Sequence, residues 1–111
     1  MAASARMMSN IKRLLQAGKI RDDTHNGILS ISFNSHVAEV EYERRGNVYD
    51  LTHTSIPDEL QGHGLGTILA ERIFDHLIQN NRKIKLTCEF LEQFYAKNED
   101  KYSRYVVNDT D

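Results

Sequence analysis

The chain has 111 residues, of which 40% are hydrophobic and 27% charged, and its net charge is −2. This length predicts one domain with a modest core, and the charge argues against nucleic-acid binding, which favours a basic surface. The single cysteine excludes an internal disulfide, no Cys/His cluster has zinc spacing, and no hydrophobic run approaches the ~20 residues that cross a bilayer.

The first 21 residues are basic and contain no acidic residue. Ile11, Leu14 and Leu15 would share one face of a helix, with basic side chains on the other face. This composition is typical of a mitochondrial transit peptide, and it equally fits a solvated leader or a docking helix. Since nothing resembles a secretory signal, we expect a cytoplasmic or mitochondrial protein that is not secreted.

Three strands are predicted next in the chain. Residues 28–33 and 37–43 alternate hydrophobic and polar side chains around an Asn34-Ser35 turn, which indicates a hairpin. After a second turn at residues 44–47, residues 48–56 read as a third strand that ends before Pro57. We expect these strands to form an antiparallel meander.

A helix and a fourth strand follow. Hydrophobic residues recur at helical spacing from the glycine-containing turn to Asn80-Asn81, and they form a wide apolar face. Residues 84–90 then alternate, which predicts a strand parallel to the third strand. A short last helix is expected over residues 91–98, and the chain after residue 106 shows no packing pattern.

The turn before the long helix is the most informative segment. Glycines at 62, 64 and 66 allow sharp backbone turns and close approach of a ligand. The first N–H groups of the helix point into this turn, which makes it suitable for a pyrophosphate. Because Gly66 is followed by Thr67 and Ile68, the turn is not a nucleotide-hydrolase P-loop, and its glycine spacing differs from the dinucleotide fingerprint.

Gln61, Gly64 and Gly66 fit the pattern Gln/Arg-x-x-Gly-x-Gly/Ala. This pattern resembles the acetyl-coenzyme A signature of the GCN5-related N-acetyltransferases. The resemblance extends from Asp50 to Tyr102, about half of the chain, and it is strongest to very small members of that family. It implies a minimal α+β fold of this type, with a mixed sheet in which the antiparallel meander is followed by a β-α-β parallel crossover and a short last helix.

The resemblance also implies a site for acetyl-CoA or coenzyme A. Main-chain groups near the end of the third strand would bind the pantetheine arm, the glycine turn would hold the pyrophosphate, and an asparagine at the end of the last helix would contact the arm. The residues assigned in this way are Thr54, Ser55, Ile56, Gln61, Gly62, His63, Gly64, Leu65, Gly66 and Asn98.

Two residues are candidates for the chemistry. His53 precedes the glycine turn, and because histidine is a common base in proteins it is a candidate for that role, although a histidine packed on the sheet fits the position better than a base does. Cys88 would face the thioester from the fourth strand and is a candidate nucleophile, whereas the alternation around it also fits a small buried side chain. No metal is expected in this chemistry.

Two functions follow from this sequence. The first is a minimal N-acetyltransferase that acts on an unidentified amine or protein, and the second is a non-catalytic module that binds coenzyme A or acyl-coenzyme A. The second stays open because the turn at Asn34-Ser35 replaces the two helices that build the acceptor site in typical family members. We expect a leader at residues 1–24, the acetyltransferase-like domain at 25–106 and a flexible tail at 107–111, without a nucleic-acid or membrane partner and with the oligomeric state open.

Overall fold

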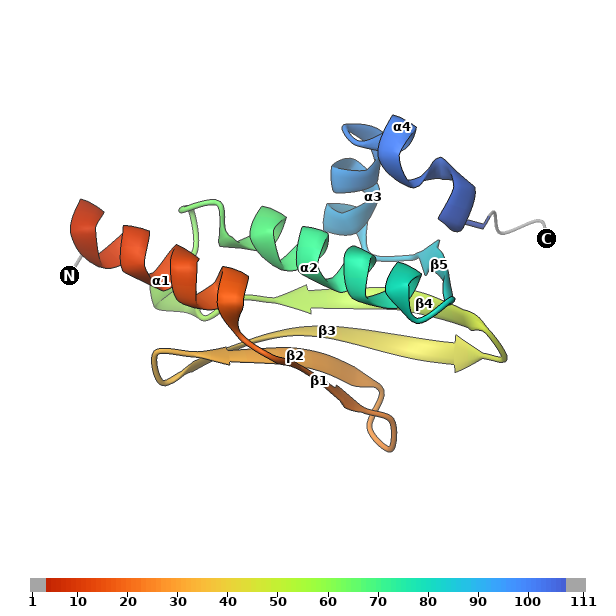
Figure 1. The fold of residues 1–111 in the computed structure, drawn as a ribbon, viewed down its shortest axis with the longest axis horizontal. Helices are drawn as coiled ribbons and strands as arrows, with labels where there is room; N and C mark the ends of the chain where they lie inside the picture. The colour runs from red at the N-terminus through yellow and green to blue at the C-terminus, as the bar shows by residue number, and fades with distance from the viewer. Residues whose placement is uncertain (1–3, 108–111) are drawn as a thin grey trace.

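The computed structural model describes residues 4–107 of the chain. They form a sheet with two long helices, α1 and α2, on one face (Figure 1). Two shorter helices, α3 and α4, lie near the edge strand β5. The strands are β1 (Ile20–Asp23), β2 (Ile28–Phe33), β3 (His36–Arg45), β4 (Val48–Ser55) and β5 (Lys83–Leu86). The helices are α1 (Ala5–Ala17), α2 (Leu65–Gln79), α3 (Glu89–Ala96) and α4 (Glu99–Tyr102), with 3₁₀ turns at Asp58–Leu60 and Ser103–Tyr105.

The sheet has five strands in the order β1-β2-β3-β4-β5. β1 to β4 pair antiparallel, and β5 pairs parallel to β4 after the crossover through α2. The predicted meander and parallel crossover are therefore confirmed. A two-residue turn joins β2 and β3, in which Asn34 has φ 46° and Ser35 has φ 65°. Positive φ at both positions matches the twist of a tight hairpin.

One face of the sheet is buried beneath the helices. Along β3, Ala38, Val40 and Tyr42 are buried, while Val37 and Glu41, at alternating positions, are exposed. Because side chains of a strand alternate between faces, the buried set lies under α1 and α2 and the exposed set lies on the open face. Figure 1 shows both helices along the same side of the sheet.

Helix α1 contributes to this core, and it packs against α2 and β2. Met8, Ile11 and Leu15 lie on its buried face at helical spacing. Ser4 caps the helix, since its side chain accepts a hydrogen bond from the backbone N–H of Met7. The expected domain boundary at residue 24 stays a prediction, and α1 and β1 lie on its N-terminal side.

The chain between residues 20 and 90 differs from the sequence prediction at two points. β1 was not predicted, because a strand of four residues with two acids, Asp22 and Asp23, carries little hydrophobic pattern. The predicted strand over residues 84–90 was wrong in its second half. β5 ends at Leu86, and α3 begins at Glu89.

The hydrogen bonds explain why β5 is short. The backbone N–H groups of Thr87 and Cys88 both donate to the carbonyl of Leu51, at 3.0 and 2.9 Å, which ends the ladder with β4. Buried residues then recur at Cys88, Leu91 and Phe94, which is the spacing of a helix. The last helix therefore begins two residues before the predicted range 91–98 and is followed by α4.

The C-terminal segment lies beside β5. Val106 pairs parallel with Ile84, and the N–H of Val107 donates to the carbonyl of Ile84 at 2.8 Å. The predicted flexible tail begins at residue 107, and its remaining residues, 108–111, lie outside the described residues.

Arg72 joins the two long helices. Its guanidinium, on α2, donates hydrogen bonds of 2.7, 2.8 and 2.6 Å to the carbonyls of Leu15, Gln16 and Gly18 at the end of α1. The last carbonyls of a helix have no partner within the helix and carry partial negative charge. One cationic side chain thus satisfies the end of α1 and fixes its position on α2.

We expect Arg72→Met to lower the free energy of unfolding by about 2 kcal/mol, because it keeps the apolar stem but removes these charged hydrogen bonds. Urea denaturation measures the change. Arg13→Met is the matched control, since Arg13 is exposed and its guanidinium donates to Asn10 one turn earlier in α1, and this variant should stay within about 0.5 kcal/mol of the wild type. Equal stabilities of the two variants would contradict this role of Arg72.

Candidate functional site

β4 and β5 part at Leu51. Their pairing runs from Val48–Lys83 to Leu51–Leu86, and beyond it β4 continues to Ser55 paired only with β3. The main chain of β4 therefore has an edge without a neighbouring strand, facing α3. An extended ligand that carries amide groups can bond to such an edge in the manner of an added strand.

A bulge in β4 sets the direction of its side chains. The pairing with β3 passes from Tyr42–Leu51 to Glu41–His53, which leaves Thr52 as an extra residue. Thr54 then pairs with buried Val40 and lies on the helix-covered face. His53 pairs with exposed Glu41, is itself exposed, and belongs to the open face.

The glycines of the turn have different structural reasons. Gly62 has φ 83° and Gly64 has φ 80°, so the backbone at both lies in the left-handed region that favours glycine. A Cβ at either position would meet nothing within 4 Å. Gly66 is helical, but a Cβ there would lie 2.7 Å from Cζ of Phe90. The ring of Phe90 thus occupies the space that a side chain at Gly66 would need.

The start of α2 attracts anions. Gly64 is the N-cap and has no side chain to satisfy the first N–H groups, and the first turn of this helix contains no acidic residue. Free N–H groups and the helix dipole give this end a partial positive charge. A phosphate or pyrophosphate is the typical ligand of such a turn.

Side chains around the turn hold its shape. Nε2 of Gln61 donates to the carbonyl of Ile56 at 3.1 Å and to a carboxylate oxygen of Asp58 at 3.2 Å. Leu60 is buried below it. Glu59 lies 3.3 Å from Nδ1 of His36, which connects the segment to the β2–β3 turn. The amide group of the predicted ligand residue Gln61 therefore stabilises the turn from within.

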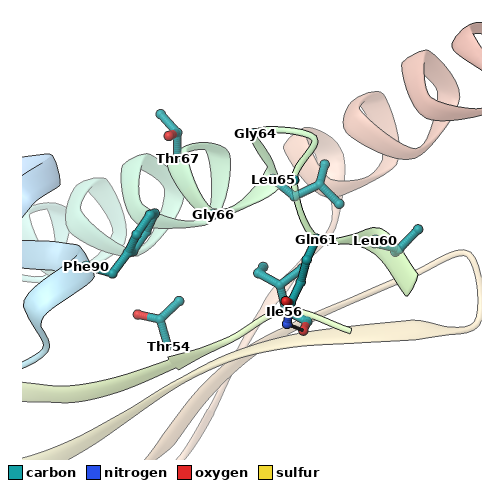
Figure 2. Close-up of a pocket in the computed structure, with 10 residues that line it drawn as sticks. Thr54, Ile56, Leu60, Gln61, Gly64, Leu65, Gly66, Thr67 and Phe90 are labelled. Atoms are coloured by element: carbon teal, nitrogen blue, oxygen red, sulfur yellow. Dashed lines mark hydrogen bonds between the residues drawn. The ribbon is translucent and has the colours of Figure 1, made fainter. Parts of the chain in front are cut away.

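A pocket of about 450 Å³ opens between the end of β4 and the first turn of α2 (Figure 2). Figure 2 shows the ring of Phe90 between this turn and the strand that carries Thr54. Seven of the residues expected to bind the cofactor line the pocket: Thr54, Ile56, Gln61, Gly62, Gly64, Leu65 and Gly66. The other lining residues are Leu60, Thr67 and Phe90.

The structure does not bring three of the expected residues into this lining. Ser55 is exposed and pairs with Glu39 on the open face, and His63 is half-buried outside the pocket. Asn98 is the N-cap of α4, and its side chain donates to the carbonyl of Phe94 at 2.7 Å. In this structure Asn98 therefore connects α3 to α4.

Cys88 is the N-cap of α3 and not a strand residue. It is 8% exposed, and its Sγ lies 3.4 Å from Oγ1 of Thr54, a residue of the pocket. The structure thus brings Cys88 to the border of the pocket through Thr54. His53, the other candidate for the chemistry, lies on the opposite face of the sheet from both.

Sequence reasoning missed three residues of the lining. Leu60 and Thr67 flank the glycine pattern, so their proximity to the pocket could have been inferred from their positions alone. Phe90 was assigned to a strand, and its place in the lining follows only from the early start of α3. Among residues 4–107, no group of three His, Cys, Asp or Glu residues could hold a metal ion.

A family model described as GCN5-related N-acetyl-transferase matches residues 29–106, and the chain belongs to this family. Within the part that the structure describes, no helix is long and apolar enough to cross a membrane.

Curated relatives agree with this assignment. Protein NATD1 of chicken and of mouse are each 33% identical over 58 residues, which cover 51% of this chain and 53% of the relative. Protein NATD1 of zebrafish is 30% identical over 70 residues, or 63% of each chain. The alignments with the chicken and mouse proteins thus span about half of their length.

A solved structure extends the similarity to nearly the whole chain. It is the solution structure of a GCN5-like candidate N-acetyltransferase from Staphylococcus aureus, with a TM-score of 0.57 and 27% sequence identity. The superposition covers 90% of this chain and 91% of that one. The predicted fold class and family are therefore confirmed.

We expect Gly64→Ala to lower the free energy of unfolding by about 1 kcal/mol, because φ 80° strains any side chain although space is open. Gly64→Asn should lower the free energy of unfolding clearly less, since asparagine tolerates the left-handed region. Chemical denaturation of both variants tests the order. If the Gly64→Ala variant were as stable as the Gly64→Asn variant, the left-handed conformation would not be the reason for glycine at this position.

Proposed function

We propose that this protein binds acetyl-CoA in the pocket at the start of α2 and transfers the acetyl group to an amine of a small molecule or protein. One observation supports this proposal most strongly. The same pocket contains the start of α2, which has neither a capping side chain nor an acidic residue in its first turn, and the part of β4 that has no strand beside it. The first feature suits a pyrophosphate, and the second suits the amide groups of a pantetheine arm. Membership of the acetyltransferase family supports the same cofactor.

The reaction needs a neutral amine. A lysine-type amine with a pKa near 10.4 is almost fully protonated at pH 7, which costs about 4 to 5 kcal/mol if the amine attacks directly. In the direct reaction the nitrogen bonds to the thioester carbon, the carbon–sulfur bond breaks, the coenzyme A thiolate leaves, and the amine loses one proton.

Cys88 supports a two-step route instead. In the first step its sulfur takes the acetyl group and coenzyme A leaves as the thiol, and in the second step the amine takes the acetyl group and the Cys88 thiol is restored. Its contact with Thr54 at the border of the pocket supports this role. His53 lies on the open face, so we do not assign it to the step at Cys88.

A non-catalytic module that binds acyl-coenzyme A is the second candidate. The observation that favours it is the surroundings of Cys88, whose sulfur contacts a hydroxyl group and is 8% exposed. A threonine hydroxyl does not take up a proton near neutral pH, so it cannot act as a general base there. Both candidates require the cofactor, and only the first requires turnover.

We place this function in the cytoplasm or the mitochondrion. The segment before residue 22 has the basic, acid-free composition of a mitochondrial address, whereas its helix α1 packs in the core of the domain. A single cysteine fits a reducing compartment.

Acetyl-CoA at a hundred times its dissociation constant should stabilise the protein by about 2.7 kcal/mol and raise the melting temperature by several degrees. Gly64→Glu should abolish the shift, because it places a carboxylate where the phosphate binds. Differential scanning fluorimetry with and without ligand measures both.

Gly46→Glu is the matched control for this experiment. Gly46 also has a positive φ, 59°, and open space around a Cβ, but it lies in the β3–β4 turn outside the pocket lining. This variant should carry the same backbone strain and keep the ligand shift. No shift in the wild-type protein would overturn both functions that depend on coenzyme A.

Cys88→Ala should reduce amine-dependent release of coenzyme A about a hundredfold or more, because it removes the proposed nucleophile. His53→Gln should stay close to the wild type. A thiol assay with acetyl-CoA and a panel of amines measures release, and intact mass after incubation with acetyl-CoA alone should show one acetyl group on the wild type and none on Cys88→Ala. Full activity without the cysteine would favour direct attack by the amine.

A further inference from the structure

Phe90 is a large hydrophobic residue left exposed at the pocket. It is 40% exposed, and it projects from the first turn of α3 into a lining that also includes Ile56, Leu60 and Leu65. An aromatic ring in this position offers apolar surface that a ligand bound in the pocket would cover.

Gly66 determines where this ring lies. A Cβ at Gly66 would come within 2.7 Å of Cζ, 3.1 Å of Cε2 and 3.4 Å of Cε1 of Phe90. The ring therefore rests on the backbone of α2 at the third glycine of the turn. Backbone strain does not require glycine there, since the φ of Gly66 is not among the positive values.

The starts of α2 and α3, which border the pocket, differ in charge. The first turn of α2 contains no acidic residue, whereas the first turn of α3 carries Glu89 and Glu92, which are exposed beside the pocket and outside its lining. A diphosphate is attracted to the first and repelled by the second. We therefore expect the part of a ligand that lies against Phe90 to be uncharged.

Thr54 marks the path that such a ligand takes. It lines the same pocket, stands across from the ring of Phe90 in Figure 2, and contacts Sγ of Cys88. A chain that runs from the start of α2 toward Cys88 passes between Phe90 and Thr54. This passage has an apolar wall on one side and the open edge of β4 on the other.

From these contacts we propose that Phe90, seated on Gly66, is the residue by which this site selects ligands with a pantetheine arm over nucleotides that carry the same phosphates. The inference rests on the proposed function and adds the residue that sets its specificity. The ring adds affinity for the uncharged arm and none for the diphosphate. Phe90 is a specificity-determining residue in this scheme and takes no part in acetyl transfer.

The test compares two ligands that share the nucleotide. Isothermal titration calorimetry gives the dissociation constants of coenzyme A and of 3′-phospho-ADP, its nucleotide half, for the wild type, Phe90→Ala and Gly66→Ala. Phe90→Ala should raise the dissociation constant of coenzyme A about tenfold, since the exposed part of the ring is of order 100 Å² of apolar surface. Binding of 3′-phospho-ADP should stay unchanged. Gly66→Ala should act in the same direction, because its methyl group displaces the ring.

Two further variants sharpen the result. Gly66→Ala combined with Phe90→Ala should be no worse than Phe90→Ala alone, because the methyl group then has no ring to displace. Met7→Ala is the control, because Met7 is similarly exposed (47%) but lies outside the pocket lining. This variant should bind both ligands with the affinity of the wild type.

The outcomes distinguish failure of the role of Phe90 from failure of the proposed function. If the wild type binds neither ligand, the proposed function fails and the inference with it. The wild type could bind coenzyme A while Phe90→Ala lowers the affinity for both ligands equally or for neither. The cofactor site would then stand, and the proposed role of Phe90 would be overturned.

Discussion

The carbonyl of Leu51 is the point on which the rest of the site depends. It accepts the N–H groups of both Thr87 and Cys88, so one acceptor ends the parallel ladder and lets the chain turn away from the sheet. Helix α3 begins at once, with Cys88 as its N-cap. β4 continues beyond this point with an edge that no strand covers, and the pocket forms in the space between β4, α2 and α3.

The glycine turn acts on this pocket from the other side. Gly62 and Gly64 give the backbone a left-handed path that turns the first N–H groups of α2 toward the pocket. Gly66 has a different role, since it leaves room for an aromatic ring from a helix that begins 23 residues later in the sequence. A pattern that reads as one motif thus combines a conformational requirement with a packing requirement.

The sequence predicts most of the sheet and the glycine turn, because alternation along β2 to β4 and the helical spacing of α2 are long, strong patterns. It misjudges residues 84–90, where Ile84, Leu86, Cys88 and Phe90 alternate by coincidence across the end of a strand and the start of a helix. The bulge at Thr52 is equally invisible in the sequence, because it depends on pairing with β3. Side-chain direction at His53 and the contact between Phe90 and Gly66 follow from these tertiary features.

Helix α1 supports the pocket although it does not line it. The pocket depends on the start of α2, and α2 is held on the sheet partly by α1, whose buried face completes the core above β2. Arg72 makes this support specific, since it binds the last carbonyls of α1 from the middle of α2. The opposite face of the sheet has no such cover at His53 and Glu41, which are exposed there. The helix-covered face therefore holds the pocket and the thiol, and the sheet separates both from His53 on the open face.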